Sequence, residues 1–116
     1  MKTVIYHNPR CSKSRATLQL LEDKGVEAEV INYLETPPSE KDLAEIISKL
    51  KIAPKELIRF KERLAKELGI APADERSDAE WISLMIENPI LIERPIVIAA
   101  GKAAIGRPID NVLTIL

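Results

Sequence analysis

The sequence predicts an α/β domain with a four-stranded mixed sheet. Three observations carry this prediction: two β-like runs flank a helix-like run near the start, the middle of the chain is mainly helical, and two short apolar runs surround Gly101 near the end. The resulting order, β-α-β, helical insert, β-β-α, fits a layered α/β domain of this size. Since 116 residues suffice for one domain but not two, we expect a single domain over residues 1–116 with a helical insertion at about 41–87.

The first third of the chain predicts a strand, a helix and a second strand. Residues 2–6 are mostly β-branched or aromatic, and their strand should stop near His7. Helical spacing of apolar residues then runs from Ser12 until Gly25 supplies a left-handed stop. A second strand at 28–34 completes a β-α-β unit, which is right-handed and has parallel strands.

The middle of the chain predicts three helices. Ser39 begins a capping-box pattern ahead of apolar residues at i, i+3, i+4 and i+7 spacing, which indicates an amphipathic helix. Residues 54–69 begin with proline and end with glycine, as helices often do, with a break possible near 60–63. A Ser-x-x-Glu box at Ser77 starts another helix, which should run to about Glu87.

The last part of the chain predicts a β-hairpin and a closing helix. Strands are expected at 96–99 and 103–106 with a turn at 101–102, and a helix at 110–116. The Arg94-Pro95 bond just before the hairpin can be cis, because X-Pro bonds tolerate that form in tight connections.

Composition excludes several classes of function. An apolar fraction of 46%, a charged fraction of 30% and a net charge of -1 are typical of a soluble globular protein and give no bulk attraction to nucleic acid or anionic membrane. No apolar run is long enough to span a bilayer, so the default compartment is the cytoplasm. We also expect a monomer. One cysteine and one histidine exclude an internal disulfide and make a Cys/His metal site unlikely to form, so redox chemistry would need an external thiol.

Cys11 falls at the N-terminus of the first predicted helix, where unpaired N–H groups and the helix dipole favour a thiolate. The dipole alone, at ~0.3–1 kcal/mol, should move the thiol pKa by less than about one unit. Any larger shift needs cations, and Arg10, Lys13 and Arg15 flank the cysteine. His7 would add to them when protonated.

A lower pKa gives only part of the reactivity. Moving the pKa from ~8.5 to ~6.5 raises the thiolate fraction at pH 7 about 25-fold, while a Brønsted slope of ~0.45 removes roughly eightfold of nucleophilicity. Arginines and N–H groups that hold an anion against Cys11 should therefore contribute more. The alternative interpretation is that Cys11 is a small buried core residue, and that His7 has a structural role.

Four blocks in order give the chain a family resemblance over essentially its whole length: Tyr6-His7-Asn8-Pro9-Arg10-Cys11-Ser12-Lys13-Ser14-Arg15, Tyr33-Leu34-Glu35-Thr36-Pro37, Asn88-Pro89-Ile90-Leu91-Ile92-Glu93-Arg94-Pro95-Ile96-Val97 and Ile105-Gly106-Arg107-Pro108. These blocks resemble the glutaredoxin-coupled arsenate reductase (ArsC) family, especially its short YfgD-type members. The resemblance implies a thioredoxin-like fold with a helical insertion, Cys11 as nucleophile, and His7 as support for the thiolate. The same resemblance implies that Ser14 and Arg15 shape the anion loop, and that the oxyanion is bound by Arg59, Arg94 and Arg107.

The resemblance also implies a reaction. The Cys11 thiolate attacks arsenate, glutathione attacks next while As(V) becomes As(III), and glutaredoxin resolves the mixed disulfide, as arsenic detoxification requires. No cofactor is bound, and glutathione is a co-substrate. The absence of a second cysteine argues against the thioredoxin-coupled arsenate reductases, and Thr17 stands where a phosphatase-like Cys-x5-Arg loop needs arginine.

Two other functions remain open at this point. One is a glutathione-dependent reductase of another thiol or oxyanion substrate. The other is an Spx-type regulator that binds RNA polymerase, although redox sensing in that group typically uses Cys-x-x-Cys, and Ser14 stands at the second cysteine position.

Overall fold

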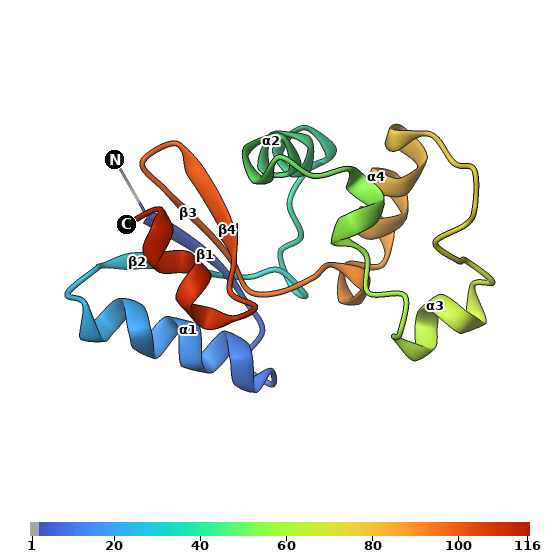
Figure 1. Ribbon diagram of the computed structural model, residues 1–116. Coiled ribbons are helices and arrows are strands. Elements are labelled where there is room, and N and C mark those ends of the chain that lie inside the picture. Colours follow the sequence, from blue (N-terminus) through green and yellow to red (C-terminus); the bar gives the residue numbers. More distant parts are fainter. Residues whose placement is uncertain (1–2) are drawn as a thin grey trace. The chain divides into compact units, whose positions relative to one another are not determined.

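The computed structural model describes residues 3–116, which form two compact units (Figure 1). The first unit contains the chain up to Thr36 and again from Arg94 onward, and the second contains Pro37–Glu93. The helical insertion expected at about 41–87 lies within the second unit. Lys2, which the sequence assigns to the first strand, lies outside the described residues.

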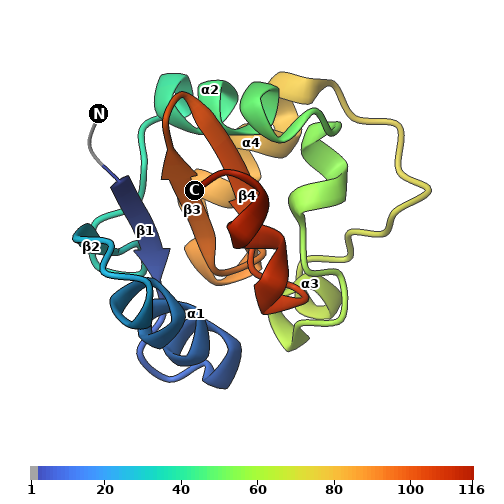
Figure 2. The same cartoon turned by 60° about the vertical axis from the view of Figure 1, so that its left-hand side comes forward.

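The first unit is built on the four-stranded mixed sheet that the sequence predicts (Figures 1 and 2). Its strands, in the spatial order β2-β1-β3-β4, are β1 (Thr3–His7), β2 (Ala28–Asn32), β3 (Ile96–Ala99) and β4 (Lys102–Ile105). β1 pairs with β2 in parallel and with β3 antiparallel, and β3 pairs antiparallel with β4. The carboxyl ends of β1 and β2 therefore lie at the same edge of the sheet, where the loop that carries Cys11 begins.

Helix α1 (Ser12–Asp23) and the 3-10 helix η3 (Ile109–Thr114) supply the hydrophobic core of the first unit. Leu21 of α1 and Val112 of η3 are fully buried against Ile5 and Val97, which pair across β1 and β3. The helix ends as predicted, because Gly25 adopts a left-handed φ of 71°. Burial of this face fixes α1, and with it the position of its N-terminus.

Strand β2 ends at Asn32, two residues before the predicted end. The Asn32 carbonyl accepts hydrogen bonds from the N–H groups of Glu35 and Thr36, at 3.1 and 2.9 Å. Its side-chain Oδ1 accepts another from Leu34 N–H at 3.2 Å. The asparagine closes a turn on itself, a local alternative to strand pairing that Asn favours.

The hairpin turn and the closing helix differ from the prediction. The turn lies at Ala100 and Gly101, whose φ values of 51° and 76° match a two-residue turn with positive φ at both positions, so β4 starts and ends one residue early. The closing segment is a 3-10 helix because its first turn is set by a bond between residues three apart, from Asn111 N–H to Pro108 O at 3.0 Å. The peptide bonds Arg94-Pro95 and Arg107-Pro108 are both cis.

The second unit is helical, as expected, with one interruption. Its elements are α2 (Glu40–Leu50), η1 (Pro54–Leu57), α3 (Arg63–Glu67), α4 (Asp78–Glu87) and η2 (Pro89–Leu91). The helix predicted over 54–69 divides because Ile58 forms a β-bridge with Ile92 and Arg59 N–H donates to Leu91 O at 2.7 Å. Backbone groups that pair with another segment cannot continue the helix.

Helix caps and one aromatic cluster stabilise the second unit. The Ser39 hydroxyl accepts from Asp42 N–H at 3.1 Å, and Ser77 and Glu80 form the reciprocal capping box that the sequence predicts. Trp81, which is 3% exposed, meets Phe60 edge to face with ring centroids 5.7 Å apart.

Replacing Gly106 with alanine should destabilise the first unit. A Cβ atom at this position would lie 2.6 Å from Thr17 Oγ1 and 2.8 Å from Pro95 Cγ, both too close. We expect the free energy of unfolding to fall by about 1–3 kcal/mol, the usual cost of overpacking, as measured by urea denaturation. In a Thr17→Ala background the same change should cost less, and an equal cost in both backgrounds would contradict the steric explanation.

Candidate active site

Cys11 is the N-cap residue of α1, as the sequence predicts. Its backbone is extended, with φ −95° and ψ 123°, and its N–H donates to Asn8 O at 3.0 Å. The residue is 8% exposed, so the thiol is mostly shielded from water. Because little water reaches the thiol, its pKa depends mainly on the polar groups that surround it.

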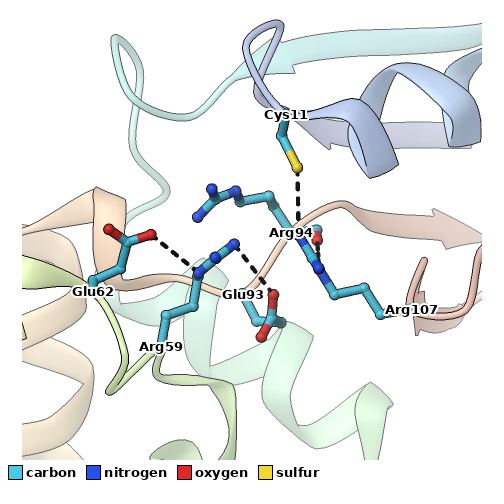
Figure 3. Close-up of polar contacts among 6 residues, drawn as sticks. All are labelled: Cys11, Arg59, Glu62, Glu93, Arg94 and Arg107. Carbon is cyan, nitrogen blue, oxygen red and sulfur yellow. Dashed lines mark hydrogen bonds and ion pairs between the residues drawn. The ribbon is translucent and has the colours of Figure 1, made fainter.

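Two arginines, one just before β3 and one just after β4, lie beside the Cys11 sulfur (Figure 3). Arg107 Nη2 is 3.4 Å from Sγ, and Arg107 Nε donates to the Arg94 carbonyl at 2.8 Å. The Arg94 side chain also hydrogen-bonds to the cysteine. Cys11 is therefore buried among cationic donors, which excludes the alternative of an apolar core cysteine.

The pKa of the Cys11 thiol lies below its ordinary value as the result of opposing effects. Burial is the largest single effect and raises the pKa. The backbone N–H of Ser14, the Arg94 side chain, the backbone N–H of Lys13 and the charge of Arg94 lower it, and together they outweigh burial. The Cys11 side chain makes no capping hydrogen bond within hydrogen-bond distance, so the effect of these N–H groups is to favour a negative charge on the nearby sulfur.

Alkylation of Cys11 by iodoacetamide should therefore follow a pH profile with a midpoint below the free-thiol value of about 8.5. Because the folded pKa is the lower one, the associated stability is fully present above the unfolded pKa and is lost as pH falls through the folded pKa. The rate is measured with the single thiol of the native protein, and the urea-unfolded protein serves as the reference. A native midpoint at or above that of the unfolded chain would contradict the activated thiolate.

His7 and Ser14 form one buried hydrogen-bonded pair. His7 Nδ1 is 2.6 Å from Ser14 Oγ, and the same hydroxyl accepts Asn8 N–H at 2.9 Å. Burial, the larger effect, and the charge of Arg15 both lower the pKa of His7, so the imidazole is neutral at pH 7. In the tautomer with the proton on Nε2, Nδ1 accepts the Ser14 hydroxyl proton. With its pKa lowered, His7 contributes little positive charge near Cys11 at pH 7, and its support for the thiolate remains a prediction.

The Arg15 side chain contacts the loop that precedes Cys11. Its Nη1 donates to Pro9 O at 2.9 Å, and its charge acts on His7. The main cationic contribution to Cys11 comes instead from Arg94, which is 83 positions away in sequence. The acceptor of the Arg15 guanidinium lies six residues earlier, in the loop before α1, so helical spacing does not predict this contact.

Arg59 lies in the second unit, between two carboxylates of that unit. Its Nε is 3.3 Å from Glu62 Oε1 and its Nη1 is 3.6 Å from Glu93 Oε1 (Figure 3). Main-chain bonds on both sides, including Glu93 N–H to Leu57 O at 2.8 Å, hold the two segments together. The pair of acidic neighbours orients the guanidinium, and the role of Arg59 in binding an oxyanion remains a prediction.

Asn8 is a loop residue whose role sequence reasoning did not identify. It is 5% exposed, its carbonyl accepts Cys11 N–H, and its side-chain Oδ1 accepts Arg10 N–H at 3.0 Å. The signal available was the Asn-Pro pair, since asparagine before proline favours a turn that its side chain can stabilise.

Two kinds of feature are absent from residues 3–116. Within that range, no group of three or more His, Cys, Asp and Glu side chains could hold a metal ion. No helix in the same range is long and apolar enough to cross a bilayer.

Comparisons with known proteins show which family the chain is similar to. The family model described as "ArsC family" matches residues 6–115. The chain is 49% identical over 113 residues to a Neisseria meningitidis protein named arsenate reductase, covering 97% of this chain and 96% of the relative, and 52% identical to Escherichia coli "Uncharacterized protein YfgD", covering 97% and 94%. A solved structure titled "Arsenate reductase from Vibrio cholerae" matches with a TM-score of 0.94 and 48% identity over 100% of this chain and 98% of that one.

Fold and site define a thioredoxin-like α/β protein with one cysteine at the start of the helix that follows the first strand. The chain belongs to the ArsC family.

Proposed function

We propose that the protein is an arsenate reductase that takes its electrons from glutathione and glutaredoxin. The observation that carries this proposal is the placement of Arg107 Nη2 3.4 Å from a thiol whose pKa is lowered by Arg94 and by helix N–H groups. A nucleophile surrounded by such donors suits attack on an anion that would otherwise be repelled. The names of the Neisseria and Vibrio relatives support arsenate as that anion.

In the first step the Cys11 thiolate attacks arsenic, and one arsenate oxygen leaves with protons as water, so an S–As(V) bond replaces an O–As bond. Arg94 and Arg107 would bind the remaining oxygens and balance their negative charge. We assign the third oxyanion contact to Arg59, held in orientation by Glu62 and Glu93. Arg15, His7 and Ser14 would act by fixing the shape of the loop before Cys11.

The reduction requires two electrons, and the chain has one cysteine to offer, so external thiols supply both. Glutathione would displace a second arsenic oxygen as water and form an As–S bond. The glutaredoxin thiolate would then attack the glutathione sulfur, forming a mixed disulfide and leaving the As–S electron pair on arsenic as As(III). Hydrolysis releases arsenite and restores Cys11. A glutathione-rich, reducing compartment fits this chemistry, and we propose the cytoplasm.

An assay of arsenite formation tests the proposal directly. The purified protein, arsenate, glutathione and glutaredoxin should give arsenite in proportion to enzyme, and omission of either thiol component should reduce the rate. Arsenite would be measured as As(III) by speciation, so that thiol oxidation without arsenate reduction is not counted. Absence of arsenite above the enzyme-free rate would remove arsenate from the proposed function.

A further inference from the structure

A polar hollow of about 290 Å³ lies in the first unit beside the loop that carries Cys11. Its lining comes from the loops that follow β1 and β2: Asn8, Pro9, Arg10, Asn32, Leu34 and Glu35. The parallel pairing of β1 and β2 places these two loops at the same edge of the sheet. The hollow is therefore formed within one unit, and part of its lining comes from the three residues that precede Cys11.

Two asparagines in the hollow present amide donors in fixed orientations. Asn8 Oδ1 is occupied by Arg10 N–H at 3.0 Å, and Asn32 Oδ1 by Leu34 N–H at 3.2 Å. Because each carbonyl oxygen already accepts a backbone hydrogen, each amide nitrogen is the atom left to meet a ligand. Within residues 3–116 neither Nδ2 group has a hydrogen-bond acceptor. The hollow thus offers N–H donors suited to a carboxylate.

The two charged residues of the hollow have opposite signs. Arg10 and Glu35 are both exposed, one on each of the two loops. A guanidinium with amide donors binds a carboxylate, and a carboxylate binds an ammonium group. This combination matches a free amino-acid end, which carries both groups on one carbon.

Glutathione, the external thiol of the proposed function, carries such an end. We propose that the polar hollow binds the charged, non-reacting end of glutathione and so delivers its thiol toward Cys11. Main-chain geometry connects the two places, because Asn8 O accepts Cys11 N–H and Arg10 directly precedes the cysteine. A hollow of 290 Å³, near the lower limit for small-molecule sites, accommodates part of a tripeptide. The assignment rests on the proposed function, which requires such a thiol.

The substitution Asn32→Asp tests the hollow with almost no change in shape. Aspartate keeps an oxygen for Leu34 N–H but replaces the amide donors with a negative oxygen. The KM for glutathione should rise at least about tenfold, while the KM for arsenate stays unchanged. With 2-mercaptoethanol, which lacks charged groups, turnover should match the wild type. Gln19→Glu adds the same charge on the exposed side of α1 and should leave all three values unchanged.

Two results would overturn the assignment. One is a glutathione KM for Asn32→Asp within about twofold of the wild-type value. The other is an equal loss with glutathione and 2-mercaptoethanol, which indicates a disturbed active site instead of a lost contact with the charged end.

Binding provides a readout that is independent of arsenate. S-methylglutathione keeps the charged ends and has no free thiol, so it can be titrated against the ¹⁵N-labelled protein. Shifts should appear at Asn8, Arg10 and Asn32, and should weaken in the Asn32→Asp and Arg10→Gln variants. If the wild type makes no arsenite, the proposed function fails, and this titration alone tests whether the hollow binds glutathione. The absence of shifts at these residues would reject the binding site.

Discussion

Replacing Cys11 with serine is expected to abolish arsenite formation, with a loss of at least about 10⁴-fold in kcat, the scale seen when a nucleophile is removed. A serine hydroxyl is a much weaker acid than a thiol, so the donors that lower the pKa of Cys11 would leave a serine at this position protonated. Oxygen also cannot form the S–As bond on which the transfer of electrons depends. The measurement is As(III) production with saturating arsenate, glutathione and glutaredoxin.

The same variant should fold normally, because serine is a favourable N-cap residue and Cys11 makes no capping bond as a thiol. Its free energy of unfolding in urea should therefore equal or exceed that of the wild type. Ser12→Ala, at the exposed next position, is the matched control and should keep its activity. Retention of wild-type turnover by Cys11→Ser would show that the reacting group lies elsewhere.

Replacing Arg94 with alanine should lower kcat/KM for arsenate by about 10²–10³-fold, as expected when one donor to a developing anion is lost. The side chain both hydrogen-bonds to Cys11 and adds positive charge beside it. Its removal should therefore also raise the pKa of the thiol. Steady-state kinetics measure the first effect, and the pH midpoint of iodoacetamide alkylation measures the second.

Two further variants separate charge from geometry at this position. Arg94→Lys keeps the positive charge but lacks the planar fork of donors, so the alkylation midpoint should recover more than kcat/KM does. Arg63→Ala removes an exposed arginine that forms an ion pair with Glu67 on α3, and activity should not change. If Arg94→Ala shifted neither the midpoint nor kcat/KM, the site as assigned would be wrong.

Local patterns in the sequence were sufficient to predict much of the fold. Gly25, Ser77 and the apolar run at residues 96–99 act through their own neighbours, so the helix stop, the capping box and the strand appear where expected. The position of Cys11 at a helix start was predictable for the same reason.

What sequence could not supply were contacts between distant segments. The pairing of Ile58 with Ile92 interrupts the helix that Pro54 and Gly69 predict at its two ends. No local pattern near Ile58 predicts this pairing. In the same way, the cations beside Cys11 are Arg94 and Arg107, which are distant from it in sequence. The Arg15 guanidinium, one helical turn from Cys11, donates to Pro9 O instead. Closeness in sequence is therefore a poor guide to which cation lies beside the thiol, because backbone carbonyls also bind arginine side chains.

The β3–β4 hairpin sets the spacing between the two arginines of the site. Arg94 and Arg107 stand at its open end, where Gly106 N–H bonds to Pro95 O at 2.9 Å, while Ala100 and Gly101 form the opposite tip. Residues added symmetrically at the tip would lengthen both arms without changing the gap between the two guanidinium groups. A single residue inserted near the open end would shift Arg94 relative to Arg107. Related chains can therefore vary in length at the tip of this hairpin and very little at its open end.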